Sequence, residues 1–495
     1  MAGLFCSVSA SLLPSSFKIS DWLAGFELQR PTIKNVNDDI LIEIFDACRM
    51  DNISPNQHPR RWWYKLAQVC QTWRRVIYAS PIRLGLTLIC TSRTPAADLL
   101  ANSPPLPLII LWGKPAPLNT KDGIENICVA LQHRDRVCRI TLHISHLFVR
   151  KMFSFLEGTF PALKTLELYG PSSESVRTRL PSTFEAPNLR HFHLSDFTLA
   201  YQPLPPTPTT FPASLVTFSL GEITPAMPVS PGFFAECLSL IPHLKSLNIG
   251  YLSPVESDNA PDQQVSHPPI LTNLEELQFQ GDSDYFERLA SQIRAPLLKK
   301  LSITFSNEPR SIGLLHLSQL IDGAPSLKFP FARVRFKNDV SIVLDHNELW
   351  TGRGALQLRF NVYLGLMDSK IEFVVRVCDR LVSTLSTVES VLLEYAEHYY
   401  SGNSGGNKRF TDASHELLRH FNNVKTLRLT QRFVEELDRS LRPDREGKVL
   451  TLLPRLQEIV CYGSDREFSA FVDARRLAGQ PVHVVSGPKN RLWLV

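Results

Sequence analysis

The chain has 495 residues, of which 43% are hydrophobic and 20% are charged, and its formal net charge is +5. The length exceeds what one compact core organises, and the hydrophobic content excludes an intrinsically disordered chain. The charge is weak and is not gathered into Lys/Arg blocks, which argues against a nucleic-acid-binding surface. No segment approaches the ~18 continuous apolar residues that span a bilayer. We therefore expect several domains or an elongated repeat architecture, with neither nucleic acid nor membrane among the partners.

The nine cysteines are scattered singly along the chain and form no Cys-x-x-Cys pair. A structural zinc site needs about four sulfur or nitrogen ligands at recurrent short spacings, and the sequence has no such spacing. Single cysteines in apolar segments are typical of reduced thiols in a cytoplasmic or nuclear protein. We therefore predict no metal site and no cofactor.

A helical module is predicted near the N-terminus, after a tail formed by residues 1–35. Apolar residues at positions 40, 41, 44, 45 and 48 follow a helical period, and Asn37–Asp39 supplies an N-cap and an acidic first turn. A polar connection follows, and the segment Trp62–Tyr78 then predicts two further short helices. Three helices are therefore expected over residues 36–84.

This module resembles an F-box in three ordered motifs. The first helix contains Glu43-Ile-Phe45, and Leu66-Ala-Gln-Val-Cys70 and Thr72-Trp-Arg-Arg75 follow. Two features depart from the family pattern, because Val36-Asn37 replaces the usual Leu-Pro opening and the first connection is longer than the common form. The resemblance implies docking to the Skp-type linker protein of a cullin-RING ubiquitin ligase.

A module of about fifty residues buries little surface by itself, so a partner helix is expected to complete its apolar faces. Several of the candidate contact residues could instead face the core of the module, notably Val69 and Trp73. The candidates are Ile40, Leu41, Ile44, Phe45, Leu66, Val69, Cys70 and Trp73.

A pattern of apolar-x-x-apolar-x-apolar recurs from about residue 136, usually after Pro or Asn. Seven consecutive copies begin at 137, 163, 189, 215, 244, 274 and 298, and two more begin at 424 and 456. Such a near-constant period predicts a solenoid whose repeats share one core. The fourth and sixth positions of each copy, such as Leu166 and Leu168, should face inward along a strand.

Helix-like apolar patterns lie between several copies, at 233–241, 286–293 and 314–321, so the strands should form a parallel sheet. The pattern resembles a leucine-rich repeat, although the Asn or Cys that follows the core in that family is missing. The fold class expected is therefore α/β, with an irregular leucine-rich repeat-like solenoid over residues 85–495.

Four stretches interrupt this predicted array. Pro-rich loops are expected at 202–212, 223–232 and 252–269, because these segments are polar and rich in proline. The region 332–387 hides the period, and its strand-like segments indicate one or two distorted repeats with an inserted hairpin.

Segments after the module, at 80–88, 91–95 and 106–110, resemble F-box proteins multiplied in mushroom-forming fungi, in which a repeat array follows. The combined resemblance implies a non-enzymatic substrate-recognition adaptor of a Skp-cullin-F-box type ubiquitin ligase. Two alternatives stay open: a protein-interaction scaffold without ligase coupling, and a hydrolase or transferase within residues 332–410.

The outward alternates of the predicted strands should form a polar concave face of mixed charge, which suits protein recognition. A merely solvated sheet face is the simpler interpretation for any one of these residues. The candidate partner-binding residues on this face are Arg139, Thr141, His143, Thr165, Glu167, Tyr169, His191, His193, Ser246, Asn248, Glu276, Gln278, Lys300, Ser302, Thr426 and Arg428.

Catalytic motifs were sought and none is convincing. His143 and His146 lack a third ligand at motif spacing, and Gly352–Gly354 and Gly402–Gly406 lack the context of a phosphate-binding loop. The sequence therefore predicts no enzyme activity, and the substrate remains open.

Overall fold

The structure is a computed structural model of the whole chain. The residues that it describes are 36–52, 62–81, 83–112, 121–145, 147–170, 177–178, 183–199, 212–225, 230–251, 269–306, 314–337, 339–346, 355–361, 367–395, 408–441, 451–462 and 468–487. The predicted tail and most of the first and third Pro-rich loops lie outside these residues. No helix in the described part of the chain is long and apolar enough to cross a membrane.

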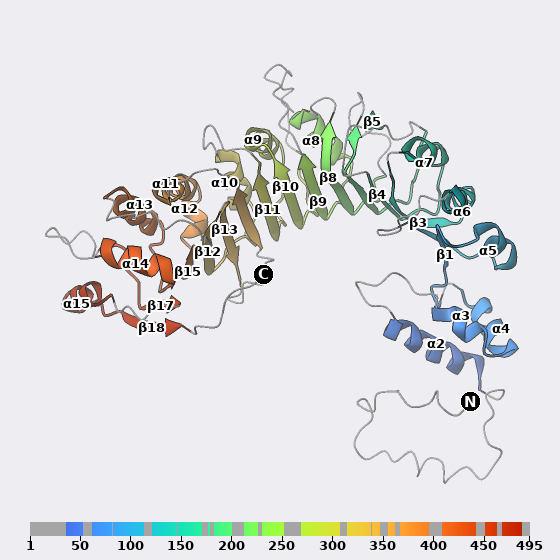
Figure 1. Cartoon of the computed structure of the whole chain (residues 1–495), viewed down its shortest axis with the longest axis horizontal. Coiled ribbons are helices and arrows are strands. Elements are labelled where there is room, and N and C mark those ends of the chain that lie inside the picture. Colours follow the sequence, from blue (N-terminus) through green and yellow to red (C-terminus); the bar gives the residue numbers. More distant parts are fainter. Residues whose placement is uncertain are drawn as a thin grey trace, which may run out of the picture. The chain divides into compact units, whose positions relative to one another are not determined.

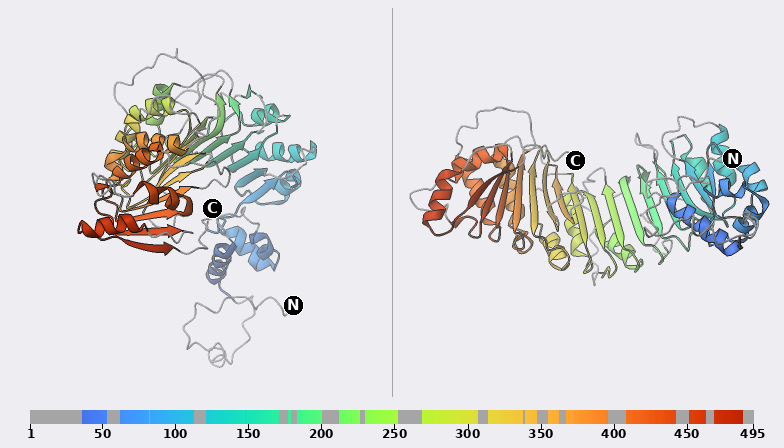
Figure 2. Two further views of the ribbon diagram at one scale, coloured as in Figure 1. Left: turned by 60° about the vertical axis from the view of Figure 1, so that its left-hand side comes forward. Right: turned by 90° about the horizontal axis from the view of Figure 1, so that it is seen from below.

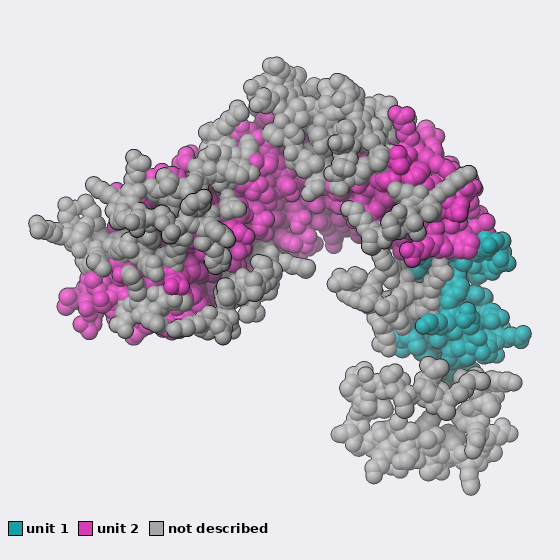
Figure 3. All heavy atoms as spheres, in the orientation of Figure 1, with its two compact units in different colours: residues 1–89, 98–107 teal, residues 90–97, 108–495 magenta. Residues whose placement is uncertain are grey.

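The chain divides into two compact units (Figure 3). Unit 1 comprises residues 1–89 and 98–107, and unit 2 comprises residues 90–97 and 108–495. Strand β1 (Leu88–Thr91) and helix α5 (Ala96–Asn102) each carry residues of both units.

Unit 1 contains the three helices expected from the sequence: α2 (Asp38–Asn52), α3 (Trp62–Ala67) and α4 (Gln71–Ala79) (Figure 1). The side chain of Asn37 accepts a hydrogen bond from the backbone N–H of Asp39 at 3.2 Å, as an N-cap does. The thiol of Cys70 accepts from the backbone N–H of Trp73 at 3.5 Å and so caps α4. Local sequence thus fixes where these helices begin.

The core of unit 1 is formed by one side of each helix. Leu41 and Phe45 of α2 are 1% and 0% exposed, and Val76 and Ile77 of α4 are also buried. The ring of Phe45 meets Trp73 edge to face, with 5.0 Å between ring centroids, which is a favoured aromatic arrangement. The unit therefore closes a small core from its own residues.

Unit 2 is a long sheet whose strands alternate with helices (Figures 1 and 2). The nine copies of the sequence pattern correspond to nine strands, which are β3 (Val137–His143), β4 (Thr165–Tyr169), β6 (His191–Ser195), β8 (Thr217–Pro225), β9 (Ser246–Tyr251), β10 (Glu276–Gly281), β11 (Lys300–Phe305), β16 (Thr426–Thr430) and β17 (Glu458–Tyr462). The helices are α6 (Lys121–Leu131), α7 (Val149–Phe155), α8 (Pro231–Ser239), α9 (Ser283–Ser291), α10 (Leu315–Asp322), α11 (Met367–Cys378), α12 (Val382–Leu385), α13 (Lys408–Arg419), α14 (Gln431–Ser440) and α15 (Ser469–Leu477). The predicted α/β fold with a mostly parallel, solenoid-like sheet is confirmed.

The inward positions of the pattern form the core of unit 2. Leu166 and Leu168 are 0% exposed, and Leu247 and Ile249 of a later repeat are also 0% exposed. The register pairs equivalent positions, so that Leu166 lies beside Phe192 in the next strand. Each repeat thus completes the apolar layer of its neighbour, as the period predicted.

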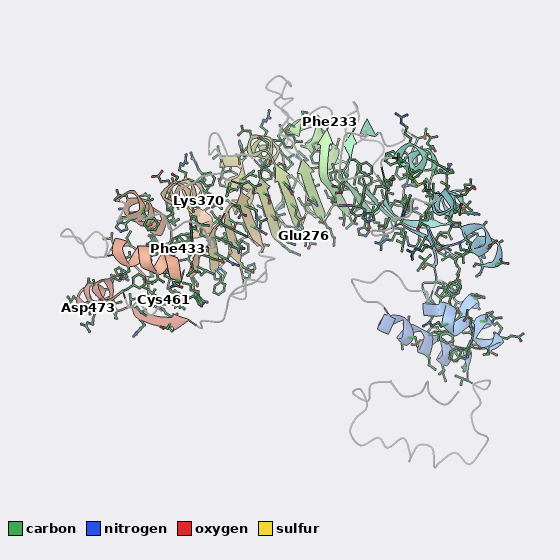
Figure 4. The ribbon with its side chains drawn as sticks, viewed as in Figure 1. Phe233, Glu276, Lys370, Phe433, Cys461 and Asp473 are labelled. Atoms are coloured by element: carbon green, nitrogen blue, oxygen red, sulfur yellow. The ribbon has the colours of Figure 1, made fainter. Side chains whose placement is uncertain are left out.

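The helices lie on one face of the sheet, and the sheet curves toward the opposite face (Figures 1 and 2). Figure 4 shows the two sides at labelled residues, with Phe233 of α8 on the side of the helices and Glu276 of β10 at the inner side of the arc. The outward alternates of the strands therefore form the concave face, as expected.

The region 332–387 breaks the parallel order with an antiparallel meander. It contains β12 (Phe331–Phe336), β13 (Val340–Asp345) and β14 (Leu356–Phe360). β14 pairs in parallel with β11, β13 lies antiparallel between β14 and β12, and β12 pairs in parallel with β15 (Ser390–Tyr395). After β11, the chain therefore places β12 three positions along the sheet and fills the two positions between them with β13 and then β14. It then crosses through α11 and α12 to β15, on the far side of β12. The predicted inserted hairpin is confirmed in this fuller form.

Polar side chains just before some copies join neighbouring repeats. The amide of Asn188 donates to the carbonyl of Pro161 at 2.8 Å, and Asn273 donates to Pro242 at the same distance. Ser214 makes an equivalent bond one repeat after Asn188. These bonds satisfy carbonyl groups at the turns into these strands, and they give a reason for the Asn and Pro that precede many copies.

One predicted loop and some strands differ from expectation. The prediction of a second Pro-rich loop at 223–232 was wrong at both ends, because Ile223–Pro225 belongs to β8 and Pro231 begins α8. Ser230 caps that helix and proline suits its first position, so these polar residues mark a helix start. The strands that the pattern did not predict are β1, β2 (Leu108–Trp112), β5 (Arg177–Thr178), β7 (Thr198–Leu199) and β18 (His483–Gly487).

Candidate interaction surfaces

Unit 1 exposes apolar side chains on the outer side of α2. Ile40 and Ile44 are one helical turn apart, and their exposed fractions are 55% and 44%. Val69, between α3 and α4, is 53% exposed. These three residues were predicted at a partner contact, and their exposure leaves them available for one.

Leu41 and Phe45, also predicted at that contact, are buried in the core of unit 1 instead. The apolar stripe of α2 is wide, so one edge of it packs on α3 and α4 while the other edge stays outside. Leu66, Cys70 and Trp73 are partly buried, and Trp73 contacts Phe45. These residues can contribute only part of their surface to a partner.

Two ion pairs link α2 to residues of α4 and beyond. Asp38 pairs with Arg75 at 2.9 Å, and Glu43 pairs with Arg83. Both pairs are largely exposed, so each contributes little to stability. Burial of Leu41 and Phe45 therefore sets the orientation of α2, and with it the direction in which Ile40 and Ile44 face.

The parallel register arranges the outward residues of unit 2 in rows across the strands. The rows at the first repeats are Arg139, Thr165 and His191; Thr141, Glu167 and His193; and His143, Tyr169 and Ser195. The other predicted concave residues continue these rows, with Ser246, Asn248, Glu276, Gln278, Lys300 and Ser302 over β9 to β11, and Thr426 and Arg428 on β16. The register therefore brings these residues to one face of the sheet, and their role in binding stays a prediction.

A polar network occupies the first rows. Arg139 pairs with Glu167 at 3.1 Å, and the hydroxyl of Thr141 donates to the same carboxylate at 3.1 Å. Thr141 is only 9% exposed, so it supports Glu167 more than it offers a surface of its own. The charges of this network are largely satisfied internally.

Three rings form a ladder beside that network. His143 stacks on Tyr169 with 4.3 Å between centroids, and Tyr169 contacts His193 at 4.8 Å. Burial, followed by the nearby charge of Glu167, raises the pKa of the Tyr169 hydroxyl above its usual range. The ladder therefore presents aromatic surface across three strands.

His193 is also held by hydrogen bonds from the next two strands. Its Nδ1 lies 2.8 Å from the hydroxyl of Ser219, which accepts a hydrogen bond from the amide of Asn248 at 3.1 Å. Burial lowers the pKa of His193 below 6.5, although Glu167 and Asp196 oppose that shift. Burial likewise lowers the pKa of His191.

Because the pKa values of these histidines are lowered, we predict that the free energy of unfolding of unit 2 decreases as the pH drops below about 6.5. The unfolded chain then takes up protons that the partly buried, neutral imidazole of His193 resists, so acid favours unfolding. We expect His193→Gln to reduce this pH dependence, since glutamine keeps a polar contact to Ser219 without a titrating ring. Urea midpoints at pH values on both sides of that range, for the two proteins, test this. If the difference in urea midpoint between the wild-type protein and His193→Gln is the same at every pH, the lowered pKa of His193 does not cause the pH dependence.

The sequence missed outward residues in the insert. Arg333 and Arg335 of β12 and Arg359 of β14 occupy outward positions of the concave face. The alternation Ala332-Arg-Val-Arg-Phe336 was a usable signal, with both arginines on the same side of the strand. The loss of the repeat period concealed which face that side would join.

No group of three or more His, Cys, Asp or Glu side chains within the described ranges is placed to hold a metal ion. The chain matches no model of a known protein family and no curated protein. The functional argument therefore depends on the arrangement of its own residues.

Proposed function

We propose that the protein is a substrate-recognition adaptor of a Skp-cullin-F-box type ubiquitin ligase. Residues 36–84, which resemble an F-box, would dock to the Skp-type linker protein, and the concave face of unit 2 would bind a protein substrate. The exposed pair Ile40 and Ile44, on a helix whose Leu41 and Phe45 are already buried, supports this most directly. Apolar side chains outside a completed core gain free energy when a partner covers them.

The docking proposal predicts that the double variant Ile40→Asp/Ile44→Asp binds the linker protein more weakly. Two carboxylates buried against an apolar partner would lose hydration without compensation, so we expect a loss of about 100-fold or more. Isothermal titration of the full-length protein with a purified Skp-type linker protein measures this loss. Circular dichroism and the thermal midpoint establish that the variant is folded.

Leu477→Asp is the matched control, because Leu477 on α15 is 87% exposed and lies in unit 2. It makes the same chemical change away from the docking helix, and binding should be unaffected. Phe45→Asp is unsuitable, since Phe45 lies in the core and its loss would unfold the unit. If the wild-type protein does not bind the linker protein, a scaffold without ligase coupling becomes the better description.

A further inference from the structure

The antiparallel meander gathers cations on one part of the concave face. Arg333 and Arg335 are successive outward residues of β12, and Lys337, just after the strand, is exposed. Arg359 lies on β14 and Arg428 on β16, so the set spans the meander and the two strands beside it. We call Arg333, Arg335, Arg359 and Arg428 the arginine cluster.

The register gives the spacing of this cluster. Arg335 and Arg359 flank Ser341 of β13, and Arg333 and Arg428 flank Leu392 of β15. Adjacent strands lie about 4.8 Å apart, so the cluster extends roughly 19 Å across five strands. That is the length of about six residues of extended peptide.

On the described part of β12 to β16 and the residues beside these strands, the carboxylates on this face are fewer than the cations. Glu394 of β15 accepts from Arg333 Nε at 2.7 Å and lies 3.7 Å from Arg335 Nε, which is an ion pair beyond hydrogen-bond range. Asp339 pairs with Arg359 at 3.0 Å. Asp345 is the remaining carboxylate on the described part of β12 to β16 that shares this face. Around Arg333, Arg335, Arg359 and Lys337, the described residues thus place four cations beside three carboxylates.

Burial makes this imbalance costly. The side chains of Arg333 and Glu394 are 12% and 11% exposed, and that of Arg335 is 28% exposed. Arg335 Nε is a buried donor without a hydrogen-bond acceptor among the residues that the structure describes. An anionic oxygen in reach of this nitrogen would form a charge-assisted hydrogen bond, and guanidinium suits carboxylate and phosphoryl groups in particular.

We propose that the arginine cluster binds an anionic segment of a protein partner, in an extended conformation with carboxylate or phosphoryl side chains. This inference rests on the proposed function, in which the concave face holds a protein substrate. The interspersed Glu394, Asp339 and Asp345 would repel the continuous phosphate backbone of a nucleic acid. They are compatible with a peptide whose charges are discrete and separated by neutral residues.

The test uses the full-length protein and three fluorescein-labelled peptides. One alternates glutamate with serine, one replaces each glutamate by glutamine, and one replaces the serines of the glutamine peptide by phosphoserine. Fluorescence anisotropy at low ionic strength, where such contacts are least screened, measures binding. We expect the glutamate or the phosphoserine peptide to bind and the neutral peptide not to bind. Whichever anionic peptide binds more tightly shows whether the cluster prefers carboxylate or phosphoryl groups.

The double variant Arg335→Gln/Arg359→Gln should weaken binding of the anionic peptide by about tenfold or more. Arg150→Gln is the matched control, because Arg150 is exposed on α7 and lies outside the concave strands. Thermal midpoints establish that both variants are folded. The proposal is overturned if neither anionic peptide binds, if both variants lose binding equally, or if a single-stranded oligonucleotide binds more tightly than the peptides.

A failure of the anionic-partner inference can be distinguished from a failure of the proposed function. The linker protein is expected to bind the double arginine variant as it binds the wild-type protein, since docking is assigned to Ile40 and Ile44. Retained linker binding together with absent peptide binding rejects only the anionic-partner inference.

Discussion

Gly170→Ala is expected to destabilise unit 2 by about 3 kcal/mol, because the added methyl group has no room. A Cβ at this position would lie 2.1 Å from the backbone oxygen of Asp196 and 3.1 Å from the ring of Phe197. The Gly170 N–H donates to Ser195 O at 2.8 Å, and the Asp196 N–H donates to Gly221 O at 3.1 Å. Neither segment can move away without losing a bond between repeats.

Gly479→Ala provides the contrast for this prediction. Gly479 has a φ of +74°, but a Cβ there would meet nothing within 4 Å. Its substitution should therefore cost only the backbone strain of a left-handed alanine, about 1 to 2 kcal/mol. Urea denaturation followed by circular dichroism compares the two variants with the wild-type protein. If Gly170→Ala and Gly479→Ala lower the free energy of unfolding equally, the contact between Gly170 and Asp196 is not tight.

Gly170 also bears on the missing leucine-rich repeat residue. In place of the Asn or Cys of that family, Leu168 is followed by Tyr169 and Gly170. The backbone of Gly170 itself bonds to the next repeat, which the absence of a side chain permits. A direct bond between turns thus takes the place of a side-chain ladder at this junction.

Most strands of the array could be predicted because their apolar positions combine two constraints. Leu166 and Leu168 alternate along a strand, and the same pair recurs one period later as Phe192 and Leu194. β2 carries no such alternation: all of Leu108–Trp112 is buried, and a short continuous apolar run fits a buried helix as well as a strand. Repetition was thus the stronger signal.

The order of β14, β13 and β12 could not be predicted from sequence. Alternation in Phe331–Phe336 indicates a strand with two faces, but it does not say which strands lie on either side. Pairing with β15, whose first residue Ser390 lies 59 positions after Phe331, decides where Arg333 and Arg335 point. The arginine cluster is therefore a product of non-local pairing.

The candidate docking surface was predictable only in part for a related reason. Helical periodicity gathers Ile40, Leu41, Ile44 and Phe45 on one broad side of α2. It does not say how much of that side the rest of the unit covers. Contacts with α3 and α4 bury Leu41 and Phe45, and that selection depends on the tertiary packing of short helices.

Glu394→Gln is expected to lower the stability of unit 2 by about 3 kcal/mol, because it removes the carboxylate that two arginines share. Glutamine keeps the shape of the side chain and one acceptor oxygen, so the loss reports on charge more than on packing. Arg333 would then remain as a largely buried cation without its anion. Denaturation with urea is the suitable measurement, since guanidinium chloride would screen the charges.

Glu389→Gln is the matched control at the start of the same strand. Glu389 immediately precedes β15 and pairs with Lys425 at 2.9 Å, but these side chains are 54% and 44% exposed. An exposed pair contributes less than about 1 kcal/mol, so this variant should be nearly as stable as the wild-type protein. Equal stability losses for the two variants would contradict the burial assigned to Glu394.

The same substitution should act in the opposite direction on binding. Without Glu394, the guanidinium groups of Arg333 and Arg335 have no internal carboxylate to compete with an incoming anion. We therefore expect Glu394→Gln to bind the anionic peptide about fivefold more tightly or better, although the protein itself is less stable. If the arginines are merely structural, Glu394→Gln will lower the stability without any gain in affinity for the peptide. Anisotropy titrations at a temperature well below the unfolding transition separate these two cases.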